Sequence, residues 1–198
     1  RNQTSVNYSV ESVLNYNDSF MDDDLTLNAM LGHSWYSYDY HNIYLQGKGF
    51  PSQSLDVVGL AAEVADYSGS AGAYRMESYF GRLSASYKNR YLLTATLRTD
   101  GSSKFAKGNR WGYFPAGSAA WVISEEPFFA NAKNKMNTLK IRASYGLTGN
   151  NGIGLYDTYG AFATDVYHGT STLLPSKMQN TGMKWETTTQ LDLGVDFG

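Results

Sequence analysis

The side chains best suited to contact a ligand are aromatic residues in two segments of the chain. Trp35 opens the first segment and has Asp39, His41 and Asn42 as near neighbours, while the second segment surrounds Tyr156. Aromatic faces beside hydrogen-bonding groups match the alternating apolar and polar surfaces of a sugar ring. The predicted ligand-contact residues are Trp35, Tyr36, Tyr38, Tyr40, Tyr44, Tyr156 and Tyr159. The alternative is that these rings only pack loops against each other or against a partner protein.

No set of residues predicts catalysis, a metal ion or a bound cofactor. His33, His41 and His168 lie in separate segments, and an isolated histidine is more often packed or interfacial than a metal ligand or base. The three consecutive acids from Asp22 to Asp24 lack the regular spacing of a calcium-binding loop. The glycines from Gly149 to Gly154 lack the Lys-Ser/Thr pair of a phosphate-binding loop. We therefore expect a protein that is not an enzyme.

Seven segments of the chain alternate apolar and polar residues, which predicts antiparallel strands with one apolar and one polar face. In the first segment, Val6, Tyr8 and Val10 alternate with Asn7 and Ser9. The segments are Ser5 to Asn17, Leu25 to Trp35, Ser78 to Lys88, Tyr91 to Asp100, Trp111 to Ile123, Leu139 to Thr148 and Trp185 to Phe197. Only the fifth is ambiguous in phase, because Gly, Ala and aromatic residues occupy both sets of positions.

Composition excludes several classes of protein. The formal net charge of -2 does not fit the basic surface of a nucleic-acid-binding protein. The chain has no cysteine, so it cannot form disulfides or thiolate metal sites. No apolar stretch approaches the roughly 18 residues of a membrane-spanning helix.

Strand length and aromatic placement favour a transmembrane barrel over a soluble sandwich. Most segments extend over about ten to fourteen residues, whereas strands of soluble proteins usually have about five or six. Large aromatic residues gather at both ends of the segments, as the two headgroup regions of a bilayer favour. We take the first segment to run downward, which defines a lower and an upper end for every segment. The lower set is Tyr16, Tyr87, Tyr91, Trp121 and Phe197, and the upper set is Trp35, Tyr79, Tyr145 and Trp185.

The connections between the segments alternate in length, which is typical of bacterial outer-membrane barrels. The lower connections are Asp18 to Asp24, Asn89-Arg90 and Ser124 to Asn137, and the upper ones are Ser37 to Arg75, Gly101 to Arg110 and Gly149 to Met183. Ser124, followed by two glutamates and Pro127, indicates the start of a short helix. Ser54 is placed to cap another short helix, from Leu55 to Val64. The predicted fold is therefore all-β, an antiparallel transmembrane β-barrel segment of about seven long strands with long extracellular loops.

Five sequence blocks resemble the barrel of SusC/RagA-type TonB-dependent outer-membrane receptors. In chain order they are RYLLTATLRTDGSSKF, RWGYFP, ISEEPF, RASYGLTGN and KWETTTQ. The resemblance is firm from Tyr79 to Gly198. The residues before Tyr79 resemble the family only in their general pattern. It implies a plugged barrel of roughly 22 strands in the bacterial outer membrane. It also implies import of glycan or peptide fragments with energy passed through TonB, and a SusD-like surface lipoprotein as partner.

The chain departs from the resembled family in four respects. It carries no signal peptide, no TonB-contacting segment and no plug domain. An odd number of strands also cannot close an antiparallel barrel. We therefore expect residues 1–198 to be a partial barrel domain of a longer receptor, with the plug domain and the remaining strands absent.

Charged residues of both signs occupy polar positions of the segments. In a barrel they would point into the lumen, where they either form ion pairs with the plug or line a hydrated wall with little net interaction. These residues are Arg82, Arg98, Asp100, Lys140, Arg142 and Glu186.

The alternative function belongs to another class, a soluble or surface-attached β-sandwich that binds carbohydrate. A sandwich would seal the apolar face with a second sheet, whereas a barrel leaves that face to outer-membrane lipid. Small residues such as Ala29, Gly81 and Ala95 on this face fit lipid better than a tight core. The expected partners are thus lipid, an oligosaccharide or peptide ligand, the lipoprotein and TonB, without nucleic acid.

Overall fold

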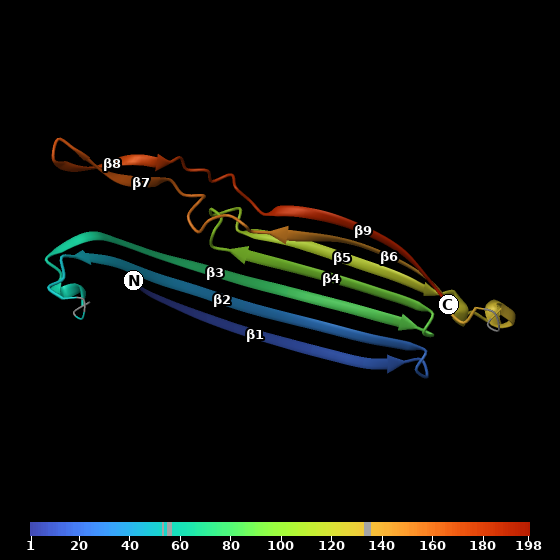
Figure 1. The fold of residues 1–198 in the computed structure, drawn as a ribbon. Helices are drawn as coiled ribbons and strands as arrows, with labels where there is room; N and C mark the ends of the chain where they lie inside the picture. The colour runs from blue at the N-terminus through green and yellow to red at the C-terminus, as the bar shows by residue number, and fades with distance from the viewer. Residues whose placement is uncertain (53, 55–56, 133–135) are drawn as a thin grey trace.

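The computed structural model, described for residues 1–52, 54, 57–132 and 136–198, is dominated by one long antiparallel sheet (Figure 1). The strand order is β1-β2-β3-β4-β5-β6-β9, and β7 pairs with β8 in a separate hairpin. The strands are β1 (Asn2–Phe20), β2 (Leu25–Lys48), β3 (Glu63–Tyr87), β4 (Tyr91–Ser102), β5 (Trp111–Val122), β6 (Leu139–Asn150), β7 (Ala161–Tyr167), β8 (Thr170–Lys177) and β9 (Glu186–Phe197). The predicted sheet of seven long strands is confirmed.

The strand register gives the sheet one apolar and one polar face, as the alternation predicts. On the apolar face, Leu93 pairs with Ala119, and Ala119 pairs with Ala143. The register also resolves β5, whose Ser118 pairs with Thr94 on the polar face. No second sheet covers the apolar face within the described residues, where its leucines remain largely exposed. This arrangement is that of a membrane sheet and does not favour the sandwich.

A stacked row of aromatic rings marks the lower end of the apolar face. The ring centroids of Tyr87 and Tyr91 lie 6.4 Å apart, as do those of Tyr91 and Trp121. Glu126 accepts hydrogen bonds from the Tyr91 hydroxyl at 2.6 Å and from Trp121 Nε1 at 2.9 Å. These bonds, together with the charge of Arg90, hold the pKa of the Glu126 carboxyl below its usual range. The row is thus fixed to the turn that follows β5.

That turn contains short helical structure where it was predicted, in the form of two 3-10 helices, but Ser124 lies inside the first of them and does not cap it. They are η2 (Ile123–Glu125) and η3 (Pro127–Ala132). Within the described residues, no helix is long and apolar enough to span a membrane. Of the other predicted helix, Leu55 lies outside the described residues, and the described part forms only the 3-10 helix η1 (Val58–Leu60) before β3 begins.

A second aromatic group marks the upper end of the apolar face. The ring of Tyr79 lies 4.8 Å from His33 and 6.1 Å from Trp111 between centroids. Tyr79 and Tyr87 are eight residues apart on β3, which corresponds to about 26 Å along the strand. With the strand tilt of 35–45° found in outer-membrane barrels, this length spans about 18–21 Å along the membrane normal, so the two groups lie within or at the edges of the roughly 25 Å apolar band.

Two connections predicted as loops contain strands. The connection predicted from Ser37 to Arg75 is mostly strand, since β2 has 24 residues and β3 has 25. These two strands reach past the upper end of β4 (Figure 1). The connection from Gly149 to Met183 contains the β7–β8 hairpin, which projects away from the main sheet (Figure 1).

The most completely buried rings lie on the polar face, below the upper connections. Phe105 is 0% exposed and Phe114 is 6% exposed, and their ring centroids lie 5.4 Å and 5.3 Å from that of Trp185. The prediction that Trp185 belongs to the upper aromatic set on the apolar face is wrong. Its Nε1 donates to the Arg110 carbonyl at 2.8 Å, and β9 begins only at Glu186, so strand alternation does not govern its direction.

An ion pair between a buried carboxylate and a half-exposed arginine lies on the polar face of β4. Asp100 is 5% exposed, and Arg98 Nε donates to its two carboxylate oxygens at 2.9 and 2.8 Å. The guanidinium also donates to Ser78 Oγ at 3.2 Å and lies 5.5 Å from the centre of the Phe80 ring. Arg98 is therefore held against the wall by its neighbours on β3 and β4.

Replacing Arg98 by alanine should lower the free energy of unfolding by about 1–3 kcal/mol, because a buried carboxylate loses its charged donor. Arg98→Lys should lose less, and adding Asp100→Asn to Arg98→Ala should recover part of the loss. Guanidinium unfolding of the full-length protein in detergent measures these differences. Equal stability of Arg98→Ala and the parent protein would contradict a structural role for the pair.

Candidate functional site

The predicted aromatic contact residues of the first segment lie on a strand rather than in a loop. Tyr36, Tyr38, Tyr40 and Tyr44 all occupy the polar face of β2, because each is an even number of residues from the next. Trp35 occupies the apolar face, opposite Glu77. The structure thus separates Trp35 from the tyrosines and assigns it to the upper aromatic group.

The tyrosines of β2 form ring pairs with each other and with β3. The centroids of Tyr38 and Tyr40 lie 5.8 Å apart, and those of Tyr36 and Tyr74 also lie 5.8 Å apart. Tyr74 is absent from the predicted contact residues, because it lies in a segment predicted as loop. The same alternation, continued upward from Ser78, would have placed Tyr74 on the polar face.

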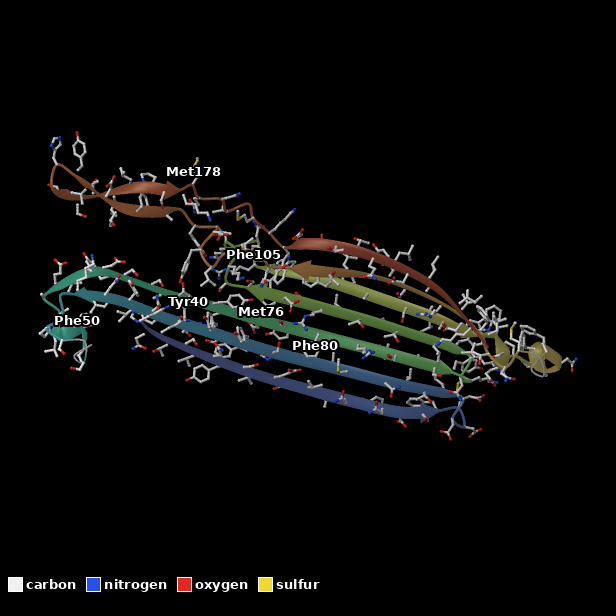
Figure 2. All side chains as sticks on the ribbon, in the orientation of Figure 1. Tyr40, Phe50, Met76, Phe80, Phe105 and Met178 are labelled. Carbon is white, nitrogen blue, oxygen red and sulfur yellow. The ribbon has the colours of Figure 1, made fainter. Side chains whose placement is uncertain are left out.

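Residues 151–160, which follow β6, bring Tyr156 and Tyr159 close to the tyrosines of β2 and β3. The Tyr156 hydroxyl accepts a hydrogen bond from the Ala73 backbone N–H at 3.2 Å. Leu155 and the ring of Tyr40, which Figure 2 labels on β2, both lie against Gly72. Tyr159 is held beside Tyr156 by a backbone bond of 3.0 Å. Two segments far apart in sequence therefore meet at one place on the polar face.

Three polar residues that sequence reasoning missed anchor this meeting point. Asn151 Nδ2 donates to the Tyr74 hydroxyl at 2.8 Å, and Lys104 Nζ donates to the Asn151 carbonyl at 3.2 Å. Lys104 Nζ also lies 5.1 Å from the centre of the Tyr74 ring. Thr158, which is 0% exposed, donates to the Lys104 carbonyl at 2.9 Å. We name this group of Tyr74, Lys104, Asn151 and Thr158 the anchor cluster.

A further ion pair ties residues 151–160 to the end of β8. Asp157 accepts a hydrogen bond from Lys177 Nζ and another from the Gly154 backbone N–H at 2.7 Å. The Lys177 hydrogen bond is the main cause that lowers the pKa of the Asp157 carboxyl, and the Gly154 bond adds to it. The base of the β7–β8 hairpin is thus joined to the segment that carries Tyr156.

All six predicted wall charges lie on the polar face, but they differ in their partners. The two on β4, Arg98 and Asp100, bind each other. Arg142 Nε lies 3.4 Å from Asp196, and Glu186 accepts from Asn150 at 3.2 Å. Lys140 is half-buried opposite Asp196 in the register. Arg82 is exposed and makes no hydrogen bond or ion pair with any described residue.

The polar face offers hydrogen-bonding and aromatic contacts rather than reactive groups. Among the residues that the structure describes, no three His, Cys, Asp or Glu side chains lie close enough together to hold a metal ion. The arrangement can bind and position a polar molecule through ring faces, hydroxyls and amides.

Comparison with known proteins places this geometry in a family. The model of the family described as TonB dependent receptor-like, beta-barrel, matches residues 1–198. A TonB-dependent receptor of Formosa agariphila is 32% identical over 209 residues, covering 100% of this chain and 19% of that protein. The TonB-dependent receptor SusC of Bacteroides thetaiotaomicron is 38% identical over 170 residues, covering 80% of this chain and 16% of SusC.

A solved structure, "Structure of the RagAB peptide transporter", has the same fold. The TM-score is 0.90 at 24% identity, over 99% of this chain and 22% of that chain. The chain therefore spans only about a fifth of the length of the curated relatives that it matches. With the family model matched from the first residue to the last, the chain belongs to the TonB-dependent receptor β-barrel family.

Proposed function

We propose that this chain forms part of an outer-membrane importer that takes up glycan or peptide fragments with energy passed through TonB. The observation that carries the proposal is the family match over all 198 residues of a sheet with an exposed apolar band and a polar opposite face. Chains of this family lie in the bacterial outer membrane. The chemistry of such a protein is recognition and passage, and we assign it no catalytic step.

Residues 1–198 are, in this proposal, a partial barrel domain of a longer receptor. The plug domain and the other strands would come from the rest of that receptor. In the described residues, the outer edges of β1 and β9 have no strand beside them. Long unpaired edges inside a membrane are not tolerated, so further strands of the same receptor would complete them.

The proposed partners are a SusD-like surface lipoprotein at the extracellular mouth and TonB on the periplasmic side. One protein of similar structure, RagAB, is named a peptide transporter. For this chain, both oligosaccharides and peptides fit the tyrosine faces and amide groups of the polar face. The receptor's cargo is therefore tested with both classes.

Import should disappear when the full-length receptor gene is deleted and return when it is restored. The probes are a casein hydrolysate and a mixture of malto-, xylo- and manno-oligosaccharides, each offered as sole carbon source. Uptake of labelled probe by energised cells, with a TonB deletion as control, measures transport directly. If neither probe enters wild-type cells faster than receptor-deleted cells, the import proposal fails.

We place the cargo contact at the paired rings of Tyr38 and Tyr40. Their alanine variants should each weaken binding of the imported probe by about 1 kcal/mol, or roughly fivefold, because an aromatic contact surface is lost. Tyr44→Ala, on the same face but without a ring partner among the described residues, is the control. Calorimetric titration of purified receptor measures the affinities. Unchanged binding and unchanged lipoprotein capture in both variants would contradict the assignment.

We also propose that wall charges hold the plug, through Arg82 and Arg142. Arg82 has no partner among the described residues, and the Arg142 side chain is 60% exposed beside Asp196. Arg98 is less suited to this role, because Asp100 and Ser78 already bind its guanidinium. Salt weakens ion pairs between exposed side chains, so retention of the plug by these arginines should fall as ionic strength rises.

Arg82→Ala combined with Arg142→Ala should make the plug accessible to protease at a lower urea concentration than in the parent receptor. The physical reason is the loss of two cationic contacts from the wall. Asn28→Ala, which removes an exposed uncharged side chain from the same face, is the control. If the double variant and the parent expose the plug at the same urea concentration, these charges do not clasp it.

A further inference from the structure

One row of small polar residues crosses the polar face from β2 to β9. The strand register places each residue directly opposite the next, so the row follows the hydrogen-bond direction of the sheet. Its members, which we call the polar row, are Asn28, Ser84, Thr94, Ser118, Ser144 and Asp192. Within the row, Ser84 and Thr94 hydroxyls lie 3.1 Å apart, and Ser144 donates to Asp192 at 3.4 Å.

The side chains beside this row are large on one half of the sheet and small on the other. In the adjacent register row, β2 and β3 carry Met30 and Arg82, whereas β5 and β6 carry Ala116 and Gly146. Large side chains therefore project from the β2–β3 half, and the β5–β6 half is recessed. Two adjoining hollows, of about 220 Å³ and 320 Å³, lie in the recessed half.

The two hollows form a single trough, because they share four lining residues of the polar row. These are Thr94, Ser118, Ser144 and Asp192. The trough runs over β4, β5, β6 and β9. Hydroxyl groups both donate and accept hydrogen bonds, so the trough suits a solute with hydroxyls or amides.

Large side chains at both ends of the trough lie flat against the wall. At the lower end, Arg142 crosses Gly194, where a Cβ would lie 2.8 Å from Arg142 Nε. At the upper end, the Phe114 ring lies over Gly149, where a Cβ would overlap the ring. Glycine at both positions keeps these side chains out of the trough.

Charges around the trough cancel. Lys140 and Arg142 are cationic, Asp192 and Asp196 are anionic, and Arg142 pairs with Asp196. Asp192 accepts hydrogen bonds from Ser144 and from Gln190 at 3.2 Å. With two charges of each sign, the lining favours a neutral polar molecule over a strongly charged one.

We propose that this trough is the path along which neutral, hydrogen-bonding cargo passes between the barrel wall and the body that fills the lumen. A body that contacts the projecting Met30 and Arg82, and Arg142 at the lower end, leaves space over the recessed strands between these contacts. The inference rests on the proposed import function and adds the route and the chemistry that the route accepts.

The test fills the trough in the full-length receptor with its native partners. Ser118→Trp places a large ring in the trough and should lower the uptake rate of whichever probe the parent imports by about tenfold. Asn28→Trp is the matched control, because Asn28 lies in the same row, is exposed, and belongs to the β2 side. The control should change the uptake rate by less than about twofold, because the hollow is not there.

A cysteine variant covers the case in which Ser118→Trp fails to assemble. The 198 residues contain no cysteine, so Ser118→Cys adds a thiol that a bulky methanethiosulfonate reagent can modify after assembly. Modification should block uptake in energised cells, and modification of Asn28→Cys should not.

The outcomes separate the two proposals. If the parent receptor imports neither the casein hydrolysate nor the oligosaccharides, the import function fails and the trough with it. If the parent imports and the filled Ser118 variants import equally well, the trough is not the path. A thiol at position 118 that never reacts, even in energised cells, would show that the plug occupies the trough and would also overturn the proposal.

Discussion

The structure depends on one constraint, that a sheet facing lipid on one side and a wet interior on the other must satisfy its own backbone. Lipid supplies no hydrogen bonds, so each strand must pair along its whole length with its neighbours. The side chains must then change character at every residue, because successive side chains point to opposite faces. The seven-strand register from β1 to β9 meets both demands at once.

Most side chains of this sheet are not buried by other parts of the described chain. Fully buried side chains such as Phe105 and Thr158 belong to the upper connections, where these fold over the polar face. The packing there joins residues 103–110 and 151–160 to β3 through the anchor cluster. The apolar face instead keeps exposed leucines between two aromatic groups, as a lipid-facing wall does.

Aromatic rings, charged side chains and small hydroxyl residues occupy different regions of the polar face. Tyrosines gather where β2 and β3 extend past β4. The ion pairs are Arg98–Asp100 within β4 and Arg142–Asp196 between β6 and β9. The polar row lies below the tyrosines and the Arg98–Asp100 pair and above the Arg142–Asp196 pair, at a level between the two aromatic groups of the opposite face. Arg142 and Phe114 lie over glycines, so these large side chains do not fill the recess over β5 and β6.

The seven strands of the main sheet and the face of most of their side chains followed from the sequence by itself, because a two-residue period is a local property of the backbone. The phase of β5 and the β7–β8 hairpin did not. The same period assigned Arg82 and Glu186 to the polar face. Tertiary structure alone decided where the strands end, since the extension of β2 and β3 depends on their pairing with each other. It also decided that Trp185 turns inward and that Tyr156 reaches Ala73 on β3, because such contacts between distant segments arise only when the connections fold back onto the sheet.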